Sequence, residues 1–256
     1  MRDFDFEMLS RRVGHLLSRN MTMKTASASK LPSTLIFDLD GCLYDAGCGL
    51  VEHVRSNLFE FMYIKEMVPR TESAEAAWLP LFKKYNQSAK ALRMGGWEFS
   101  DDEYWAFMRS GADKFLQRDG PLDSLLSALP QRKFIMTNCA EKQALECLDM
   151  MGVTHHFDKV FGANFMGTMC KPEEAAFQAV CDEIGVTPSD VCFFEDSYKN
   201  LVTCNRMGMT TVFVKGFTAE EEGVSVEQER ILDAIVPTLS DQNGEGLKKQ
   251  LPYLFA

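Results

Sequence analysis

Two aspartates one residue apart, Asp38 and Asp40, follow a short apolar run that ends at Phe37. Alternate residues of an extended chain face the same way, so the two carboxylates should point together and repel each other. A second acidic pair, Glu195 and Asp196, follows another apolar run, "VCFF". Four carboxylates in one place need a compensating cation, and oxygen ligands favour Mg²⁺ over zinc. The sequence therefore predicts one bound Mg²⁺ among these acidic residues.

Three more polar residues are expected at the same place. Thr137 and Asn138 follow the apolar run "KFIM", and Lys171 precedes a proline that could open a helix. Lysine is a compact cation that can pair with phosphoryl oxygens, while Thr137 adds a hydroxyl and Asn138 an amide. A carboxylate can attack phosphorus and hold the phosphoryl group covalently. A second acid two residues away can protonate the leaving alkoxide and then deprotonate water, and Asp40 fits that role.

The elements that must position these residues alternate along the chain. Helical patterns at 141–151, 172–184 and 198–207 separate the later apolar segments. This alternation predicts an α/β fold in which a parallel sheet has helices on both faces. Ligands bind at the carboxyl edge of such sheets, where all the candidate residues are expected to converge. The expected strands are short, apolar and rich in β-branched or aromatic residues: 34–37, 133–136, 159–161, 191–194 and 210–214.

The stretch between the first two expected strands breaks this alternation. It shows no convincing strand from about 50 to 129, but helical segments at 51–68, 72–91 and 101–116, with Pro80 as an expected kink. We therefore expect a helical insertion in the sheet domain. The predicted divisions are an N-terminal extension at 1–33, a core domain at 34–49 and 121–256, and a helical cap domain at 50–120.

Taken together, the motifs resemble those of the haloacid dehalogenase (HAD) superfamily. They are "FDLDG" at 37–41, "TN" at 137–138, "KP" at 171–172 and "FFEDSYKNL" at 193–201, and the resemblance covers about 34 to 215. It implies a Rossmann-like parallel sheet. It also implies that the helical insertion is an α-helical C1 cap, which closes over the site and selects the leaving group.

The resemblance also implies a role for each candidate residue. Asp38 would be the nucleophile and an Mg²⁺ ligand, and Asp40 would be the acid/base and would bind the metal through its backbone carbonyl. Thr137 would bind the phosphoryl group, which Lys171 would stabilise. The metal site would be completed by Asp196, and by Glu195 directly or through water.

Within the superfamily, the motifs look closest to the pyrimidine 5′-nucleotidases of fungi and plants, whose first motif commonly reads DLDNTLY. Here Gly41 stands where that branch often has Asn, and Cys42 where most of the superfamily has Thr or Val. Neither position supplies a catalytic group. The resemblance implies a Mg²⁺-dependent phosphomonoester hydrolase that acts through an aspartyl phosphate. Its expected partner is a small phosphorylated metabolite, such as a pyrimidine nucleoside 5′-monophosphate.

Other functions stay open. A sugar-phosphate phosphatase or a phosphomutase would differ only in the cap and the acceptor, and a catalytically silent binding or regulatory protein would share the fold. A 2-haloacid dehalogenase is disfavoured, because it needs no Mg²⁺ and lacks an acid at the position of Asp40. Several aromatic residues of the insertion could either stack on a nucleobase or form the core of the insertion. They are Trp78, Trp97, Phe99, Tyr104, Trp105 and Phe107.

Charge and cysteine content restrict the partners and the setting. The formal net charge of −10 argues against general affinity for nucleic acid or an anionic membrane. No apolar run is long enough to cross a bilayer. The eight cysteines include no C-x-x-C pair, which favours reduced thiols in a cytoplasmic protein. The first thirty residues are basic and rich in serine and threonine, a composition typical of transit peptides, so organelle import is an alternative.

Overall fold

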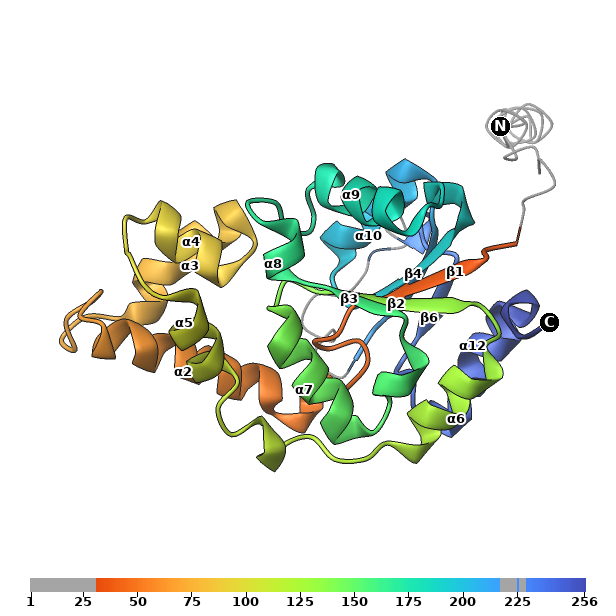
Figure 1. Cartoon of the computed structure of the whole chain (residues 1–256), viewed down its shortest axis with the longest axis horizontal. Helices are drawn as coiled ribbons and strands as arrows, with labels where there is room; N and C mark the ends of the chain where they lie inside the picture. Colours follow the sequence, from red (N-terminus) through yellow and green to blue (C-terminus); the bar gives the residue numbers. More distant parts are fainter. Residues whose placement is uncertain (1–30, 217–224, 226–228) are drawn as a thin grey trace, which may run out of the picture. The chain divides into compact units, whose positions relative to one another are not determined.

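The computed structural model describes residues 31–216, 225 and 229–256, and its centre is a six-stranded parallel sheet (Figure 1). The predicted α/β fold with a parallel sheet is confirmed. Most of the predicted extension at 1–33, including the transit-peptide-like residues, lies outside the described part of the chain. The strands are β1 (Thr34–Phe37), β2 (Arg132–Met136), β3 (Lys159–Phe161), β4 (Val191–Glu195), β5 (Thr210–Val214) and β6 (Ala234–Val236).

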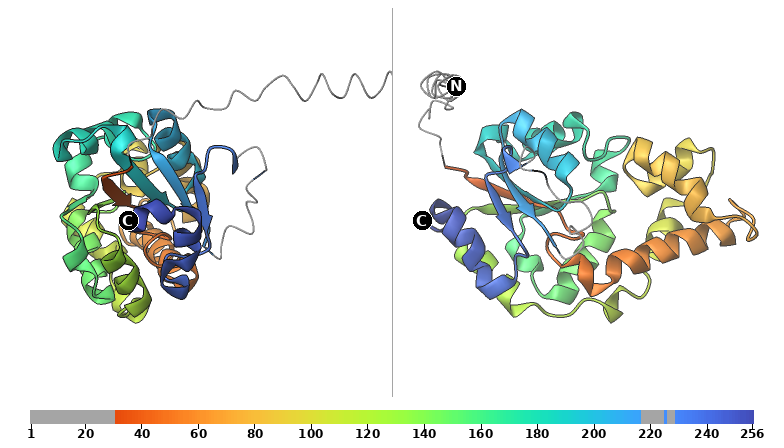
Figure 2. Two further views of the ribbon diagram at one scale, coloured as in Figure 1. Left: turned by 90° about the vertical axis from the view of Figure 1, so that its right-hand side faces the viewer. Right: turned by 180° about the vertical axis from the view of Figure 1, so that it is seen from behind.

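Helices cover both faces of the sheet (Figures 1 and 2). One face packs on α6 (Gly120–Ala128), α7 (Glu141–Met151) and α12 (Glu245–Gln250). The other packs on α8 (Ala163–Met166), α9 (Glu174–Ile184) and α10 (Tyr198–Met207). Strands buried on both sides read as continuous apolar runs, which is why "TLIF" and "VCFF" show no polar alternation.

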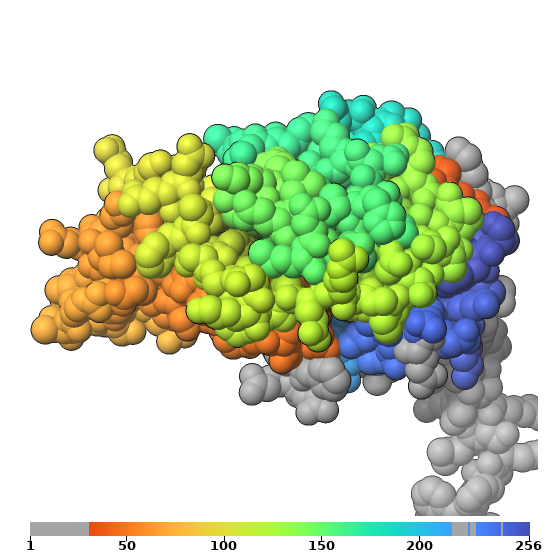
Figure 3. Space-filling model, turned by 60° about the horizontal axis from the view of Figure 1, so that its bottom comes forward, coloured from red at the N-terminus to blue at the C-terminus, as the bar shows by residue number. Residues whose placement is uncertain are grey.

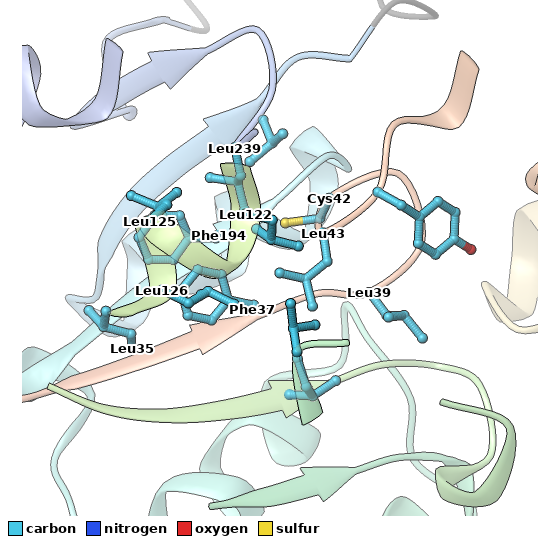
Figure 4. Packing of buried hydrophobic residues seen from close by; sticks show 14 of the residues in the cluster. Leu35, Phe37, Leu39, Cys42, Leu43, Leu122, Leu125, Leu126, Phe194 and Leu239 are labelled. Atoms are coloured by element: carbon cyan, nitrogen blue, oxygen red, sulfur yellow. The ribbon is translucent and has the colours of Figure 1, made fainter. Parts of the chain in front are cut away.

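The side chains of β1 show how the two faces are filled. Leu35 and Phe37 belong to the core beneath α6 and α7, and Ile36 belongs to the core on the opposite face. Phe37 stacks on Phe194 of β4, with ring centroids 4.3 Å apart. Figure 4 shows this pair packed with Leu122 of α6. The strand that carries the first motif is therefore fixed from both sides.

Between β1 and β2 the chain forms the helical insertion (residues 50–116), which contains four α-helices and no strand. The helices are α2 (Leu50–Ile64), α3 (Ala74–Tyr85), α4 (Ser88–Met94) and α5 (Asp101–Met108). They share a core of their own that includes Phe61, Trp78 and Tyr104. In the space-filling view of Figure 3, the orange-to-yellow surface of the insertion adjoins the green surface of the segment that includes α7.

Three helices of the insertion end earlier than the sequence suggested, and the first is α2, which ends at Ile64 rather than near residue 68. The segment 72–91 breaks at Asn86, which takes a left-handed conformation (φ 59°) and ends α3, whereas Pro80 lies inside α3. Helix α5 ends at Met108 rather than near residue 116, and Gly111 follows with φ 80°. Residues 31–256 group as one compact unit, and their division into a core domain and a cap domain stays a prediction.

The strand order places the site. It runs β3-β2-β1-β4-β5-β6, so the chain moves outward from β1 in one direction through β2 and β3 and in the other through β4, β5 and β6. A reversal of this kind opens a crevice at the carboxyl ends of the two central strands. Those strands are β1 and β4, which precede the two acidic motifs.

Two further features concern the whole described chain. In the residues that the structure covers, no helix combines the length and the apolar character that a membrane span would need. All eight cysteines are free thiols, and all but Cys48 are buried.

Candidate active site

All of the site residues predicted from the sequence line one cavity of about 270 Å³ at the carboxyl edge of the sheet. The core contributes the motif residues, and helices α2 to α5 of the insertion, with their connecting loops, contribute residues on the other side. The predicted residues that meet there are Asp38, Asp40, Thr137, Asn138, Lys171, Glu195 and Asp196.

The sheet itself delivers three of these residues. The backbone N–H of Asp38 donates to the carbonyl of Phe194 (2.9 Å), which extends the pairing of β1 with β4 by one residue. Thr137 extends β2 in the same way, through an N–H bond to the carbonyl of Phe161 (2.9 Å). Glu195 is the last residue of β4. Their side chains therefore emerge at the same edge because parallel strands end together.

Lys171 forms the centre of a buried charge cluster. Its Nζ lies 2.7 Å from Oδ1 of Asp38 and 2.7 Å from Oε2 of Glu195. Burial by itself would lower the pKa of Lys171, but the charges of these two carboxylates outweigh it and raise that pKa. Lys171 is therefore a permanent cation at the base of the cavity.

Asn138 holds Lys171 in position. The Asn138 Oδ1 accepts a bond from the backbone N–H of Lys171 (2.9 Å), and its Nδ2 donates to the Lys171 carbonyl (3.1 Å). The same Nδ2 lies 3.3 Å from the carbonyl of Asn86, on the helical insertion. Its amide is thus bonded to backbone groups, which suits a residue that orients the lysine.

Three carboxylates form a group that could hold a metal ion. Oxygens of Asp38, Glu195 and Asp196 lie within 4.8 Å of one another. Burial and the charge of Glu195 raise the pKa of Asp38 to about 8, against the opposing effect of Lys171. Burial and the charges of Glu195 and Asp38 raise the pKa of Asp196 well above its ordinary value. A hard divalent cation with oxygen ligands would relieve this excess of negative charge, so the residues fit the predicted Mg²⁺.

Gly41 allows this cluster to close. It adopts φ +78°, and a Cβ built at this position would lie 2.3 Å from Oδ2 of Asp196. Any larger residue would combine an unfavourable backbone conformation with a direct clash. The glycine where pyrimidine nucleotidases often have Asn therefore matches the close approach of Asp196 in this chain.

The side chain of Asp40 has different partners from the other three carboxylates. Its Oδ2 lies 2.5 Å from Nη2 of Arg109, and its Oδ1 accepts a bond from the Tyr44 hydroxyl. Burial would raise the pKa of Asp40, but the Arg109 guanidinium outweighs burial and lowers it. The predicted metal contact through the Asp40 backbone carbonyl stays a prediction. Arg109 was not predicted from the sequence, because it lies in no motif. The other partner of Asp40, Tyr44, lies close behind the first motif in the sequence.

The helical insertion supplies the rest of the cavity wall. Tyr104, Trp105 and Phe82 line it, and Gln87 donates a side-chain bond to the Asn138 carbonyl (2.8 Å). Trp78 stacks on Phe82 within the core of the insertion, with ring centroids 4.6 Å apart. Among the aromatic residues considered for base stacking, Tyr104 and Trp105 line the cavity, although Tyr104 is itself buried in the insertion core. Trp78, Trp97, Phe99 and Phe107 pack in that core and do not line the cavity.

Solved structures with the same fold include several hydrolases and a mutase. β-Phosphoglucomutase from Clostridium difficile matches with a TM-score of 0.55 and 17% identity, over 87% of this chain and 98% of its own. A predicted phosphoglycolate phosphatase from Haemophilus somnus 129pt matches at 0.53 and 18%, over 82% and 96%. L-2-Haloacid dehalogenase from Xanthobacter autotrophicus matches at 0.52 and 18%, over 83% and 97%. At these identities the likeness shows the fold.

The family model described as haloacid dehalogenase-like hydrolase matches residues 35–214. The match runs from β1 to the end of β5 and so includes the helical insertion and every motif at the cavity. The chain therefore belongs to the haloacid dehalogenase-like hydrolase family.

Proposed function

We propose that this chain is a Mg²⁺-dependent phosphomonoester hydrolase in which Asp38 takes up the phosphoryl group. The observation that supports this most strongly is the buried contact of Lys171 with Asp38 and Glu195, beside a second acid, Asp40. A carboxylate paired with a fixed cation, at the base of a cavity, suits attack on an anionic phosphoryl group.

In the first step, a carboxylate oxygen of Asp38 attacks phosphorus and the bond from phosphorus to the ester oxygen breaks. Lys171 stabilises the phosphoryl oxygens, and Thr137 offers its hydroxyl to them. Asp40 gives its proton to the leaving oxygen. In the second step, Asp40 takes a proton from water as the water attacks phosphorus. The bond to Asp38 then breaks and inorganic phosphate leaves.

The predicted metal would be held by Asp38, Glu195 and Asp196. When bound, a divalent cation would supply positive charge that offsets the negative charge of the carboxylates and of the phosphoryl group. Two cations at the cavity are already paired with carboxylates, because Lys171 contacts both Asp38 and Glu195 and Arg109 contacts Asp40.

Asp40 needs to change its protonation during this cycle. In the free protein, Arg109 keeps the pKa of Asp40 low. Asp40 is therefore ionised and is the carboxylate that the second step requires. In the first step an anionic phosphoryl group enters beside Asp40, and a neighbouring negative charge raises the pKa of a carboxyl group. Substrate entry thus favours the protonated form when a proton has to be donated.

We propose a small phosphorylated metabolite as the substrate, with pyrimidine nucleoside 5′-monophosphates first among the candidates. The cavity of about 270 Å³ lies near the lower end of the usual range for ligand sites, roughly 300–1,000 Å³, which favours a compact molecule. Trp105, which lines the cavity and is only partly buried, offers aromatic surface for a base. The free cysteines support a reducing compartment, proposed to be the cytoplasm, and organelle import stays a prediction.

The test is phosphate release from a panel of UMP, CMP, AMP, GMP, flavin mononucleotide and sugar phosphates, each with Mg²⁺ and with EDTA. We expect metal-dependent release that is highest with UMP and CMP. Asp38→Asn should abolish release while circular dichroism shows an intact fold, because the amide cannot act as the nucleophile.

Other outcomes would redirect the assignment. Preferred release of phosphate from a sugar phosphate would agree with the proposed mechanism but would contradict a nucleotide as the substrate. Isomerised product without free phosphate would indicate a phosphomutase. No turnover of any compound, or full turnover by Asp38→Asn, would contradict the proposed function and favour a binding role.

A further inference from the structure

A buried cation in the cavity comes from the helical insertion. Arg109 follows the last turn of α5, and only 6% of its side chain is exposed. A guanidinium cannot lose its charge in a protein, so its burial is tolerated only with close partners. Those partners are Asp40 of the first motif, 69 residues away in the sequence, and Tyr44, 65 residues away.

The contacts form a closed set around the carboxylate of Asp40. Arg109 Nη2 lies 2.5 Å from Asp40 Oδ2, and Arg109 Nη1 donates to the Tyr44 hydroxyl at 3.1 Å. The Tyr44 hydroxyl in turn donates to Asp40 Oδ1. Both carboxylate oxygens are therefore bonded from different directions, which fixes the side-chain rotamer of Asp40. A planar, forked guanidinium can bridge two acceptors in this way, and a lysine ammonium cannot reproduce its geometry.

This fixed carboxylate still faces the cavity. About a third of the Asp40 side chain (32%) is exposed, and both Asp40 and Arg109 line the cavity wall. We propose that Arg109 is a positioning residue for Asp40, which it holds toward the leaving group of a substrate bound over Asp38. This inference rests on the proposed function. It makes the helical insertion a contributor to proton transfer in addition to shaping the cavity.

The test compares kcat/KM for two substrates that differ in their need for an acid. The ribose 5′-oxygen of UMP, or the alkoxide of the best sugar phosphate, must be protonated as it leaves, whereas nitrophenolate from p-nitrophenyl phosphate leaves without a proton. For Arg109→Met we expect kcat/KM to fall about 10²-fold with the alkyl phosphate, the typical contribution of a positioned acid. With p-nitrophenyl phosphate it should stay within about threefold of wild type.

Two variants separate positioning from folding. Tyr44→Phe removes one of the two bonds to Asp40 and should reproduce the same substrate dependence to a smaller degree. Arg109→Lys keeps the charge, and so carries the test if Arg109→Met does not fold; it should lose part of the activity toward the alkyl phosphate only. Arg70→Met is the matched control, because Arg70 is an exposed arginine of the same insertion that pairs with Glu60.

A double-mutant cycle gives the sharpest outcome. If Arg109 acts through Asp40, then Arg109→Met should have no further effect on the alkyl phosphate in the Asp40→Asn background. Additive effects would overturn the inference. So would equal losses with both substrates, or a change in KM alone, since these would make Arg109 a direct substrate ligand. A wild-type protein that hydrolyses neither substrate would overturn the proposed function, and this inference with it.

Discussion

The two aspartates of the first motif have opposite environments. Burial and Glu195 raise the pKa of Asp38, and Arg109 lowers that of Asp40. Titratable groups whose pKa values are pushed apart by their surroundings commonly have different chemical roles. Asp38 and Asp40 lie close together because one residue separates them in the sequence. Their partners Glu195 and Arg109 come from other parts of the chain and shift the two pKa values in opposite directions.

We predict that Mg²⁺ binds more tightly as the pH rises to about 8, the pKa of Asp38 in the folded protein. Below that pH the cation must displace a proton, so its affinity should rise by up to about tenfold per pH unit. Without metal, the folded state holds this proton after the unfolded chain has lost it. Asp38 therefore lowers the stability of the metal-free protein as the pH rises from about 4 to about 8.

Titration calorimetry with MgCl₂ at about pH 6 and about pH 8 measures this dependence directly, and proton release appears as a difference between buffers. Asp38→Asn should bind Mg²⁺ more weakly and with a flatter pH dependence. Equal wild-type affinity at the two pH values would show that no proton is displaced from the cluster.

At the scale of elements, strand ends and one tight turn assemble the site. The turn at Gly41 brings the segment after β1 against Asp196, which follows β4. We predict that Gly41→Ala weakens Mg²⁺ binding about tenfold, because the new Cβ forces the Asp196 carboxylate away from Asp38 and Glu195. The left-handed backbone should also cost about 1–2 kcal/mol of stability.

Gly208→Ala is the matched control for this prediction. Gly208 has φ +88° at the end of α10, and a Cβ there meets nothing within 4 Å. This variant should lose similar stability in denaturant unfolding and bind Mg²⁺ as the wild type does. If both variants bind Mg²⁺ normally, the approach of Asp196 to Gly41 does not matter for the metal site.

Local sequence patterns predicted most of the strands and missed some of the helix ends. The expected strands were found within one residue of their bounds, because strands buried on both faces give short continuous apolar runs. Helix α6 begins with Gly-Pro, which weakens its helical pattern, and it was not predicted. Strand β6 was not predicted either, although β3 has the same length of three residues. The end of α3 at Asn86 was not predicted, because an asparagine in a sequence indicates a left-handed residue less clearly than a glycine does.

At the scale of the whole molecule, the helical insertion and the sheet share one cavity. The motifs predicted the residues that the sheet domain contributes to that cavity, because three of the four motifs lie at the carboxyl end of a strand and parallel strands end together. The pairing of Arg109 with Asp40 joins residues 69 positions apart. Neither the periodicity of hydrophobic residues nor the spacing of the motifs predicts such a contact, because the contact depends on how α5 packs against the core.

We propose that Asp38 carries the phosphoryl group between the two steps of the reaction. The most direct measurement uses Asp40→Asn, in which nitrophenolate can leave without an acid but water lacks its base. The variant is mixed with p-nitrophenyl phosphate and Mg²⁺, quenched in acid, digested and analysed by peptide mass spectrometry. We predict one phosphoryl group on Asp38, and none when Asp38→Asn is added. Phosphorylation at another residue, or turnover that survives Asp38→Asn, would contradict the mechanism.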